Sequence, residues 1–389
     1  MLGTVVDADA HINETPLGWA WLHERWPGWL SAAESGGRTV AGIDGRAYPL
    51  QEGRGRGVPI DSALHPACRS GAFDLDGRIA DMDSEGIDIQ VLYGGLSLGV
   101  TGFSDPGFAA DFAQQYNDWL LDEVGAAHPD RLVGVCTVPL QDPARALTEL
   151  HRVAAKGAYA LTIPPMVGER NLDDRALDEF FAAAADADLA LGVHSAPGMH
   201  LPLPGADRFA NYAQVHLLSF PIDQMVAFTA LALGGVLDRH PGLRVAFLEA
   251  GVGWVPYLVD RAHEHQEKRA ELLPDMRSTP RELIERGQCY FSFECEDPFL
   301  THYVEQFGSA GVLFASDYPH WDAEWPGCVE SARALAEPLG DAAVAAVMGE
   351  NARRFYALDG GAASGAGAVD SVSDSRVNTA SEQGLGSAP

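Results

Sequence analysis

Eight short segments rich in β-branched and aromatic residues recur along this 389-residue chain, and Ala- and Leu-rich stretches separate them. The separating stretches, such as PARALTELHRVAAKGA, repeat their apolar residues at helical spacing. This alternation predicts an α/β fold in which eight parallel strands form a closed (β/α)8 barrel, with an open doubly wound sheet as the weaker alternative. The sequence lacks GxGxxG and GxxxxGK(S/T) motifs, which removes the usual reason to expect a nucleotide-binding sheet. The predicted strands are residues 5–12, 89–95, 132–140, 159–166, 189–195, 244–251, 289–294 and 312–320.

Two regions depart from the alternation. Residues 13–77 form a long insertion after the first predicted strand, and loops of this length in a compact domain are usually functional or disordered. We interpret the insertion as an inserted lid or loop region. Residues 359–389 contain no aromatic side chain and few large apolar ones, which predicts a disordered tail. We therefore expect a single barrel domain over residues 1–358.

The chain is strongly acidic, with a formal net charge of −29 at pH 7 and a pI near 4.6. Such a charge argues against partners that carry a phosphate backbone and against an anionic membrane surface. The five cysteines form no CxxC pair, which argues against a disulfide framework and a structural zinc knuckle. No secretory leader and no apolar run of membrane-spanning length is visible. We expect a soluble, cytoplasmic protein with a small-molecule substrate.

Side chains of the kinds that bind metals fall at the carboxyl ends of four predicted strands. Asp9 and His11 lie on one face of the first strand, because residues i and i+2 of a strand share a face. His194, Glu249 and Asp317 end the fifth, sixth and eighth strands. The carboxyl ends of barrel strands meet at one mouth, where the chemistry of such folds takes place.

Each of these residues also has a purely structural explanation. Asp9 and His11 could form an internal ion pair, and His194 could be a hydrogen-bonded histidine of the core. Asp317 could start a turn, and Glu249 could cap the following helix. None of these explains why all five fall at the same end of the barrel, so we favour a shared site. Two imidazoles and two carboxylates suit one divalent ion, with Zn²⁺ expected first and Mn²⁺ or Fe²⁺ as alternatives.

The motifs around these residues resemble the amidohydrolase superfamily, specifically the amidohydrolase 2 group related to aminocarboxymuconate semialdehyde decarboxylase and gamma-resorcylate decarboxylase. The resemblance spans residues 5–358 and rests on DADAHINE, GRIADMDSEGIDIQVLYG, GVHSAPG, GVLDRHPGLRVAFLEAGVGWVPYLVDR and FASDYPHWD. It implies a distorted (β/α)8 barrel that holds one divalent ion. The implied ligands are Asp9, His11, His194 and Asp317. Binuclear members of the superfamily use a carboxylated lysine at the end of the fourth strand, which here ends LTIPPM without one.

The sequence departs from the group at the sixth strand. The characterised decarboxylases carry a histidine there, which donates and accepts the proton, whereas this chain has Glu249 in FLEAGVGW. A glutamate acts as acid or base if burial raises its pKa toward neutrality. It can equally orient a ligand or a metal-bound water. Sequence alone allows both roles for Glu249.

Four further residues are candidates for substrate binding. His216 precedes a helical stretch, and His320 follows Asp317 closely enough to touch the substrate or support the ligands. Arg54 lies in the glycine-rich part of the insertion, where it could clamp a carboxylate. Glu294 ends the seventh strand. Simple exposure is the competing explanation for Arg54.

We expect a mononuclear metal-dependent hydrolase that attacks a lactone, amide or diketone with metal-activated water. In that reaction Asp317 would accept the proton from the water and Glu249 would pass it to the leaving group. The alternative is a non-oxidative decarboxylase of an aromatic or muconate-type acid, in which a protein acid protonates the carbon. A non-catalytic binding barrel is the third hypothesis. Analogy with the family predicts a homodimer.

Overall fold

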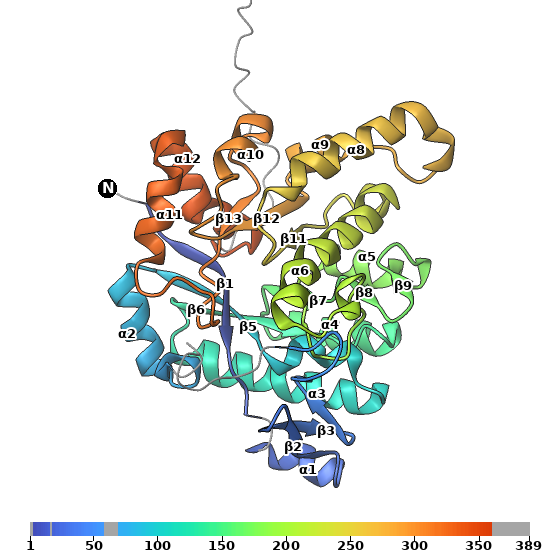
Figure 1. The fold of residues 1–389 in the computed structure, drawn as a ribbon, viewed down its shortest axis with the longest axis vertical. Coiled ribbons are helices and arrows are strands. Elements are labelled where there is room, and N and C mark those ends of the chain that lie inside the picture. The colour runs from blue at the N-terminus through green and yellow to red at the C-terminus, as the bar shows by residue number, and fades with distance from the viewer. Residues whose placement is uncertain (1–2, 16–17, 58–68, 360–389) are drawn as a thin grey trace, which may run out of the picture.

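The computed structural model describes residues 3–15, 18–57 and 69–359 (Figure 1). Eight strands form one sheet in the order β1-β5-β6-β7-β10-β11-β12-β13, and all of its paired neighbours run parallel. The strands are β1 (Val6–Ile12), β5 (Ile89–Gly94), β6 (Leu132–Thr137), β7 (Ala160–Ile163), β10 (Ala190–Val193), β11 (Val245–Phe247), β12 (Cys289–Phe293) and β13 (Val312–Phe314). Each of the eight predicted strands is confirmed.

The first and last strands of this sheet meet, so the sheet is nearly closed. The N–H of Asp317 donates to the carbonyl of Asp9 over 3.0 Å, and the N–H of His11 donates to the carbonyl of Tyr318 over 2.6 Å. These bonds join the segment after β13 to β1. The predicted distorted (β/α)8 barrel is confirmed, and the open-sheet alternative is wrong.

Helices lie outside the barrel, between successive strands and after the last strand (Figure 1). They are α2 (Leu75–Glu85), α3 (Pro106–Trp119), α4 (Pro143–Ala155), α5 (Asp178–Asp186), α6 (Tyr212–Phe228), α7 (Val236–Arg239), α8 (Trp254–Arg269), α9 (Pro280–Glu285), α10 (Leu300–Phe307), α11 (Cys328–Ala336), α12 (Asp341–Ala345) and α13 (Asn351–Phe355). Asp105 and Asp142 each precede a proline and accept backbone N–H groups of the first turn of α3 and α4. These Asp-Pro pairs start the helices because the carboxylate caps free N–H groups and proline needs none.

The insertion after β1 contains a small antiparallel sheet, at the lower end of Figure 1. Its elements are α1 (Ala20–Arg25), β2 (Leu30–Ser35), β3 (Arg38–Ile43) and β4 (Arg46–Tyr48). The rings of Trp26 and Trp29 pack against Phe108 of α3, with centroids 5.5 and 5.0 Å away. This part of the insertion is therefore anchored to the barrel. Residues 58–68 and the predicted disordered tail beyond Asp359 lie outside the described residues.

Helix α6 is the most apolar of the outer helices. With the π turn after it, Tyr212–Leu233, it is long and apolar enough to be considered for crossing a membrane, but 56% of its apolar window is buried within the protein. The side chain of Gln224 is fully buried and donates to the carbonyls of Val193 and Leu248, each over 3.0 Å. Packing against the barrel explains the apolar composition of α6, and Gln224 fixes the ends of β10 and β11.

Candidate metal centre

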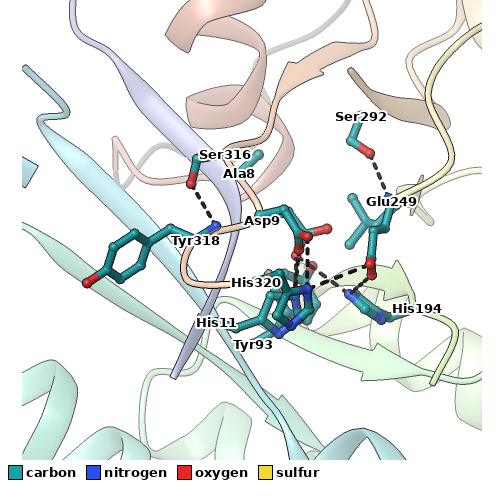
Figure 2. Close-up of polar contacts among 12 residues, drawn as sticks. Ala8, Asp9, His11, Tyr93, His194, Glu249, Ser292, Ser316, Tyr318 and His320 are labelled. Carbon is teal, nitrogen blue, oxygen red and sulfur yellow. Dashed lines mark hydrogen bonds and ion pairs between the residues drawn. The ribbon is translucent and has the colours of Figure 1, made fainter. Parts of the chain in front are cut away.

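Asp9, His11, His194 and Asp317 come together at the carboxyl end of the barrel, as the sequence predicts. Figure 2 shows the side chains of Asp9, His11 and His194 close to one another. His11 Nε2 lies 3.3 Å from Asp317 Oδ1 and 3.8 Å from Asp9 Oδ1. His194 Nε2 lies 3.8 Å from the same oxygen of Asp9. Glu249 joins this group, because its Oε2 lies 3.2 Å from His194 Nε2. All five side chains are buried.

The backbone directs these side chains into two overlapping groups that could hold a metal ion, and His11 belongs to both groups. The register of β1 against β5 shifts between Asp7 and Ala10, a bulge-like irregularity of the kind that re-aims side chains next to active sites, and Asp9 lies within it. Glu249 and Asp317 follow their strands with positive φ angles of 54° and 55°. Residues other than glycine avoid this left-handed region, and such strain concentrates at functional sites.

His11 and His194 present the same ring nitrogen, Nε2, to the middle of this group of five side chains, which we call the centre. His11 Nδ1 bonds the carbonyl of Gly94 over 3.2 Å, and His194 Nδ1 bonds the carbonyl of Ser195 over 2.6 Å. A carbonyl can only accept, so each Nδ1 carries the hydrogen. The lone pair of each Nε2 therefore faces the carboxylates, as in histidines that bind a metal.

The atoms that face the centre lack partners among the described residues. Six buried atoms there accept or donate no hydrogen bond: Asp9 Oδ1, Asp9 Oδ2, His11 Nε2, His194 Nε2, Glu249 Oε2 and Asp317 Oδ1. Buried polar atoms are almost always paired, so a cluster of unpaired lone pairs indicates a missing cation. Imidazole nitrogens and carboxylate oxygens are the ligands of Zn²⁺, Mn²⁺ and Fe²⁺. The residues present fit the divalent ion that the sequence predicts.

Burial and mutual repulsion shift the pKa values in this cluster. Burial, together with the charge of Asp317, raises the pKa of Asp9 and of Glu249 well above the usual range. Burial lowers the pKa of His11, and it lowers that of His194 to about 3. Both imidazoles are therefore neutral. A bound cation would stabilise the ionised carboxylates and these neutral imidazoles.

His320 lies in direct contact with this cluster. Its Nδ1 bonds Asp317 Oδ2 over 2.8 Å, and its ring stacks on that of His11 with centroids 4.1 Å apart. Burial would raise the pKa of Asp317, but the charge of His320 and the hydrogen bond from His320 lower it below the usual value. Burial lowers the pKa of His320, but Asp317 and Glu249 raise it well above the usual value.

Aromatic side chains border the centre on the side of α6. His216 contacts the rings of Tyr212, Phe220 and Trp321 with centroids 5.0 to 5.6 Å apart, and we call these four residues the aromatic wall. The ring of Phe220 lies 6.4 Å from that of His194, so the wall adjoins the candidate ligands. His216 Nε2 also lies 3.3 Å from Asp322 Oδ2.

The structure separates the other two substrate-binding candidates. Glu294 is half-buried at the end of β12, where burial and the charges of Asp317 and Asp322 raise its pKa to about 8. It therefore lies within electrostatic reach of the centre. Arg54 is exposed, and in the described ranges no hydrogen bond or ion pair joins it to the candidate ligands.

Sequence reasoning missed Tyr212, Phe220, Trp321 and Asp322. Trp321 and Asp322 complete the motif FASDYPHWD, so their nearness to Asp317 was a usable signal. For Tyr212 and Phe220 the only signal was helical spacing. They lie four residues before and after His216, so the three residues share one face of the helix.

A family model described as Amidohydrolase matches residues 6–358. The 2-amino-3-carboxymuconate-6-semialdehyde decarboxylase of Dictyostelium discoideum is 27% identical over 358 residues, covering 90% of this chain and 91% of that protein. The gamma-resorcylate decarboxylase of Polaromonas sp. (strain JS666) is 26% identical over 271 residues, covering 65% of this chain and 80% of that protein.

A solved structure of a dihydroxybenzoic acid decarboxylase from Polaromonas sp. JS666, with bound manganese and the inhibitor 2-nitroresorcinol, has a TM-score of 0.70. At 19% identity, over 92% of this chain and 98% of that one, it supports the fold alone. The family match spans the three strands whose ends carry the predicted ligands. The chain therefore belongs to the amidohydrolase family, a group of metal-dependent enzymes.

Proposed function

We propose that this protein is a metal-dependent, non-oxidative decarboxylase of an aromatic or muconate-type acid. The observation that carries the proposal is the cluster of unpaired ligand atoms beside an aromatic wall, at the mouth of a barrel whose curated relatives are named decarboxylases. The ring of the substrate would lie against the wall, and its carboxylate would face the cluster. This function was the alternative on sequence grounds, and the relatives favour it over hydrolysis.

In this proposal Asp9, His11, His194 and Asp317 hold the divalent ion. The ion supplies positive charge that binds and orients the anionic substrate. Burial of the cluster keeps water away and strengthens each electrostatic contact. The protein side chains thus select an acid whose carboxylate is next to a flat, apolar ring or diene.

The aromatic wall provides the second point of attachment. Trp321 is 42% exposed and Phe220 is buried, so the wall runs from the surface down to His194. Stacking against such rings aligns the bond between ring and carboxylate with the cluster. The neighbouring pair His216 and Asp322 offers a donor and an acceptor to a ring hydroxyl.

The reaction breaks the bond between the ring carbon and the carboxylate, and the electron pair stays on that carbon. CO₂ leaves, and one proton from a protein acid completes the product. Glu249 is the acid that the sequence suggests. His320 is a second candidate, since its Nδ1 is bonded to Asp317 and its Nε2 is left for the substrate.

Hydrolysis is the second candidate function, and the observation in its favour is Glu249. A carboxylate 3.2 Å from a candidate ligand nitrogen is placed to take a proton from an activated water. The decarboxylases of the group use a histidine for their proton transfer, and this chain does not have it at that strand end.

A panel of hydroxybenzoates, muconate-type acids, lactones, amides and diketones tests both functions. The metal-loaded protein should release CO₂ from an acid of the panel, and in deuterated water the product should carry one deuterium at the vacated carbon. Uptake of oxygen-18 from labelled water without CO₂ would instead show hydrolysis and would refute the decarboxylase. Zn²⁺, Mn²⁺ and Fe²⁺ should be compared, since a structural relative binds manganese. The homodimer and the cytoplasmic location stay predictions.

A further inference from the structure

Glu249 lies closer to a predicted ligand nitrogen than the predicted ligand Asp9 does. Two donors that bind one ion at about 2.1 Å, at angles between square and tetrahedral, lie roughly 3.0 to 3.4 Å apart. Glu249 Oε2 lies 3.2 Å from His194 Nε2, and Asp317 Oδ1 lies 3.3 Å from His11 Nε2. Asp9 Oδ1 lies farther from both imidazoles, at 3.8 Å. If Asp9 is accepted as a ligand at 3.8 Å from the imidazole nitrogens, Glu249 at 3.2 Å should be accepted as well.

The contact between Glu249 and His194 needs a positive charge between its two atoms, which either a metal ion or a proton on Glu249 can supply. The hydrogen of His194 is on Nδ1, which bonds the carbonyl of Ser195, so Nε2 presents a lone pair. Glu249 Oε2 faces that lone pair and has no hydrogen-bond partner among the described residues. A carboxylate oxygen and an imidazole lone pair repel each other unless a positive charge lies between them.

The other contacts of Glu249 hold it in this position without binding Oε2. Its backbone N–H donates to the hydroxyl of Ser292 over 2.9 Å, and its φ of 54° turns the residue out of the strand direction (Figure 2). Its Oε1 lies 3.7 Å from His320 Nδ1, which is beyond hydrogen-bond distance. Oε2 is thus the oxygen that is directed at the centre.

From this geometry we infer that Glu249 is a fifth protein ligand of the ion, rather than a free acid beside it. The ligand set becomes three carboxylates and two imidazoles. Such an oxygen-rich set with five donors suits Mn²⁺ or Fe²⁺ better than Zn²⁺, which prefers four ligands. The inference rests on the proposed metal centre but not on the reaction.

Metal titration of purified variants tests the inference without an activity assay. Glu249→Gln keeps the shape and removes the charge, Asp9→Asn is the reference for loss of a ligand, and Glu294→Gln removes a buried carboxylate near the centre. The dissociation constant for Mn²⁺, measured by competition with a chromophoric chelator, should rise by more than about 100-fold in Glu249→Gln, because loss of a residue that only supports the ligands costs about 10- to 100-fold. Asp9→Asn should behave alike, and Glu294→Gln should stay within about threefold of the wild type. A smaller rise of the dissociation constant in Glu249→Gln would mean that Glu249 does not bind the ion itself, and this would overturn the inference.

A crystal structure of the Mn²⁺-loaded wild type decides the question even if the variant does not fold. A distance of about 2.0 to 2.3 Å between Glu249 Oε2 and the ion supports ligation, and a water between them refutes it. If the wild type binds no ion, the metal centre itself fails. If it binds through Glu249 but releases no CO₂ from any acid, the inference stands and only the proposed reaction fails.

Discussion

Asp7 Oδ1 accepts the backbone N–H of Ser316 over 2.9 Å, although 309 residues separate the two in the sequence. The hydroxyl of Ser316 donates to the other oxygen of Asp7 over 2.5 Å, and Gln90 donates to it over 2.9 Å. Asp7 is fully buried, two residues before Asp9, and Ser316 directly precedes Asp317. The carboxylate thus ties together the two chain segments that carry most of the candidate ligands.

Replacing Asp7 should therefore weaken the whole barrel. Asp7→Ala leaves four buried donors without an acceptor, since the N–H of Asp9 also donates to Asp7 Oδ1 over 3.4 Å. This loss should cost roughly 3 to 5 kcal/mol in the free energy of unfolding. Asp7→Asn keeps one acceptor oxygen and should cost less. Urea unfolding followed by circular dichroism measures both values. Equal stability of Asp7→Ala and the wild type would show that the closure does not depend on this carboxylate.

Gln224→Leu should loosen the strand ends that carry His194 and Glu249. The variant leaves the carbonyls of Val193 and Leu248 without their donor, at a cost of roughly 2 to 4 kcal/mol. The matched control is Gln214→Leu, which makes the same exchange at an exposed position of the same helix. Thermal denaturation should show a clearly lower Tm for Gln224→Leu and little change in Tm for Gln214→Leu. Equal losses of stability in the two variants would mean that the change from glutamine to leucine, and not the loss of the two hydrogen bonds, destabilises the protein.

The free energy of unfolding of the chelator-treated protein should fall between about pH 4 and pH 7, in part through Asp223. Burial raises its pKa to about 7, although a hydrogen bond from Ser195 opposes this, while an unfolded Asp has a pKa of about 3.9. Because the folded pKa is the higher one, this contribution is fully present below about pH 4 and is lost as pH rises through about 7. The free energy of unfolding of Asp223→Asn should therefore increase relative to that of the wild type by a few kcal/mol as the pH rises over this range. Urea unfolding at several pH values checks it, and parallel curves for the two proteins would refute it.

Trp321→Ala should weaken substrate binding more than turnover. Loss of one stacking ring should raise KM for an aromatic acid roughly five- to tenfold, with kcat within about twofold. Trp21→Ala is the matched control, because Trp21 is 40% exposed and Trp321 is 42% exposed, but Trp21 lies on the insertion. Steady-state kinetics with the active acid of the panel measures both constants. A fall in kcat at constant KM would remove Trp321 from the binding surface.

Removal of the ion should lower thermal stability. Ligand present at about 1,000 times its dissociation constant stabilises a protein by about 4 kcal/mol, so Tm should rise by at least about 5 °C when Mn²⁺ or Zn²⁺ is added back. Asp9→Asn should lose most of this rise. Differential scanning calorimetry measures it, and an identical rise in Asp9→Asn would point to metal bound elsewhere.

Much of the candidate site could be predicted because the topology of a barrel fixes where the ends of its strands lie. Asp9 and His11 share a face by strand periodicity, and closure of the sheet brings the ends of distant strands together. The position of His194 and Asp317 follows from the same rule. The conformation of Glu249 does not, because its positive φ depends on contacts made by the finished fold.

The insertion shows a signal that was present and not used. Gly36-Gly37 and Asp44-Gly45 all have positive φ and join β2 to β3 and β3 to β4. Such pairs between alternating segments are the strongest short-range indication of a hairpin. The lid or loop interpretation overlooked them. By contrast, the direction of Arg54 depends on loop contacts that no local pattern encodes.

The contact between β1 and the segment after β13 also has a consequence for biosynthesis. A ribosome adds Asp9 and His11 first and Asp317 more than three hundred residues later, so a nascent chain lacks the last of its predicted ligands for most of translation. An unfinished polypeptide cannot complete the chelate. Capture of the ion would therefore report that synthesis has passed the last strand.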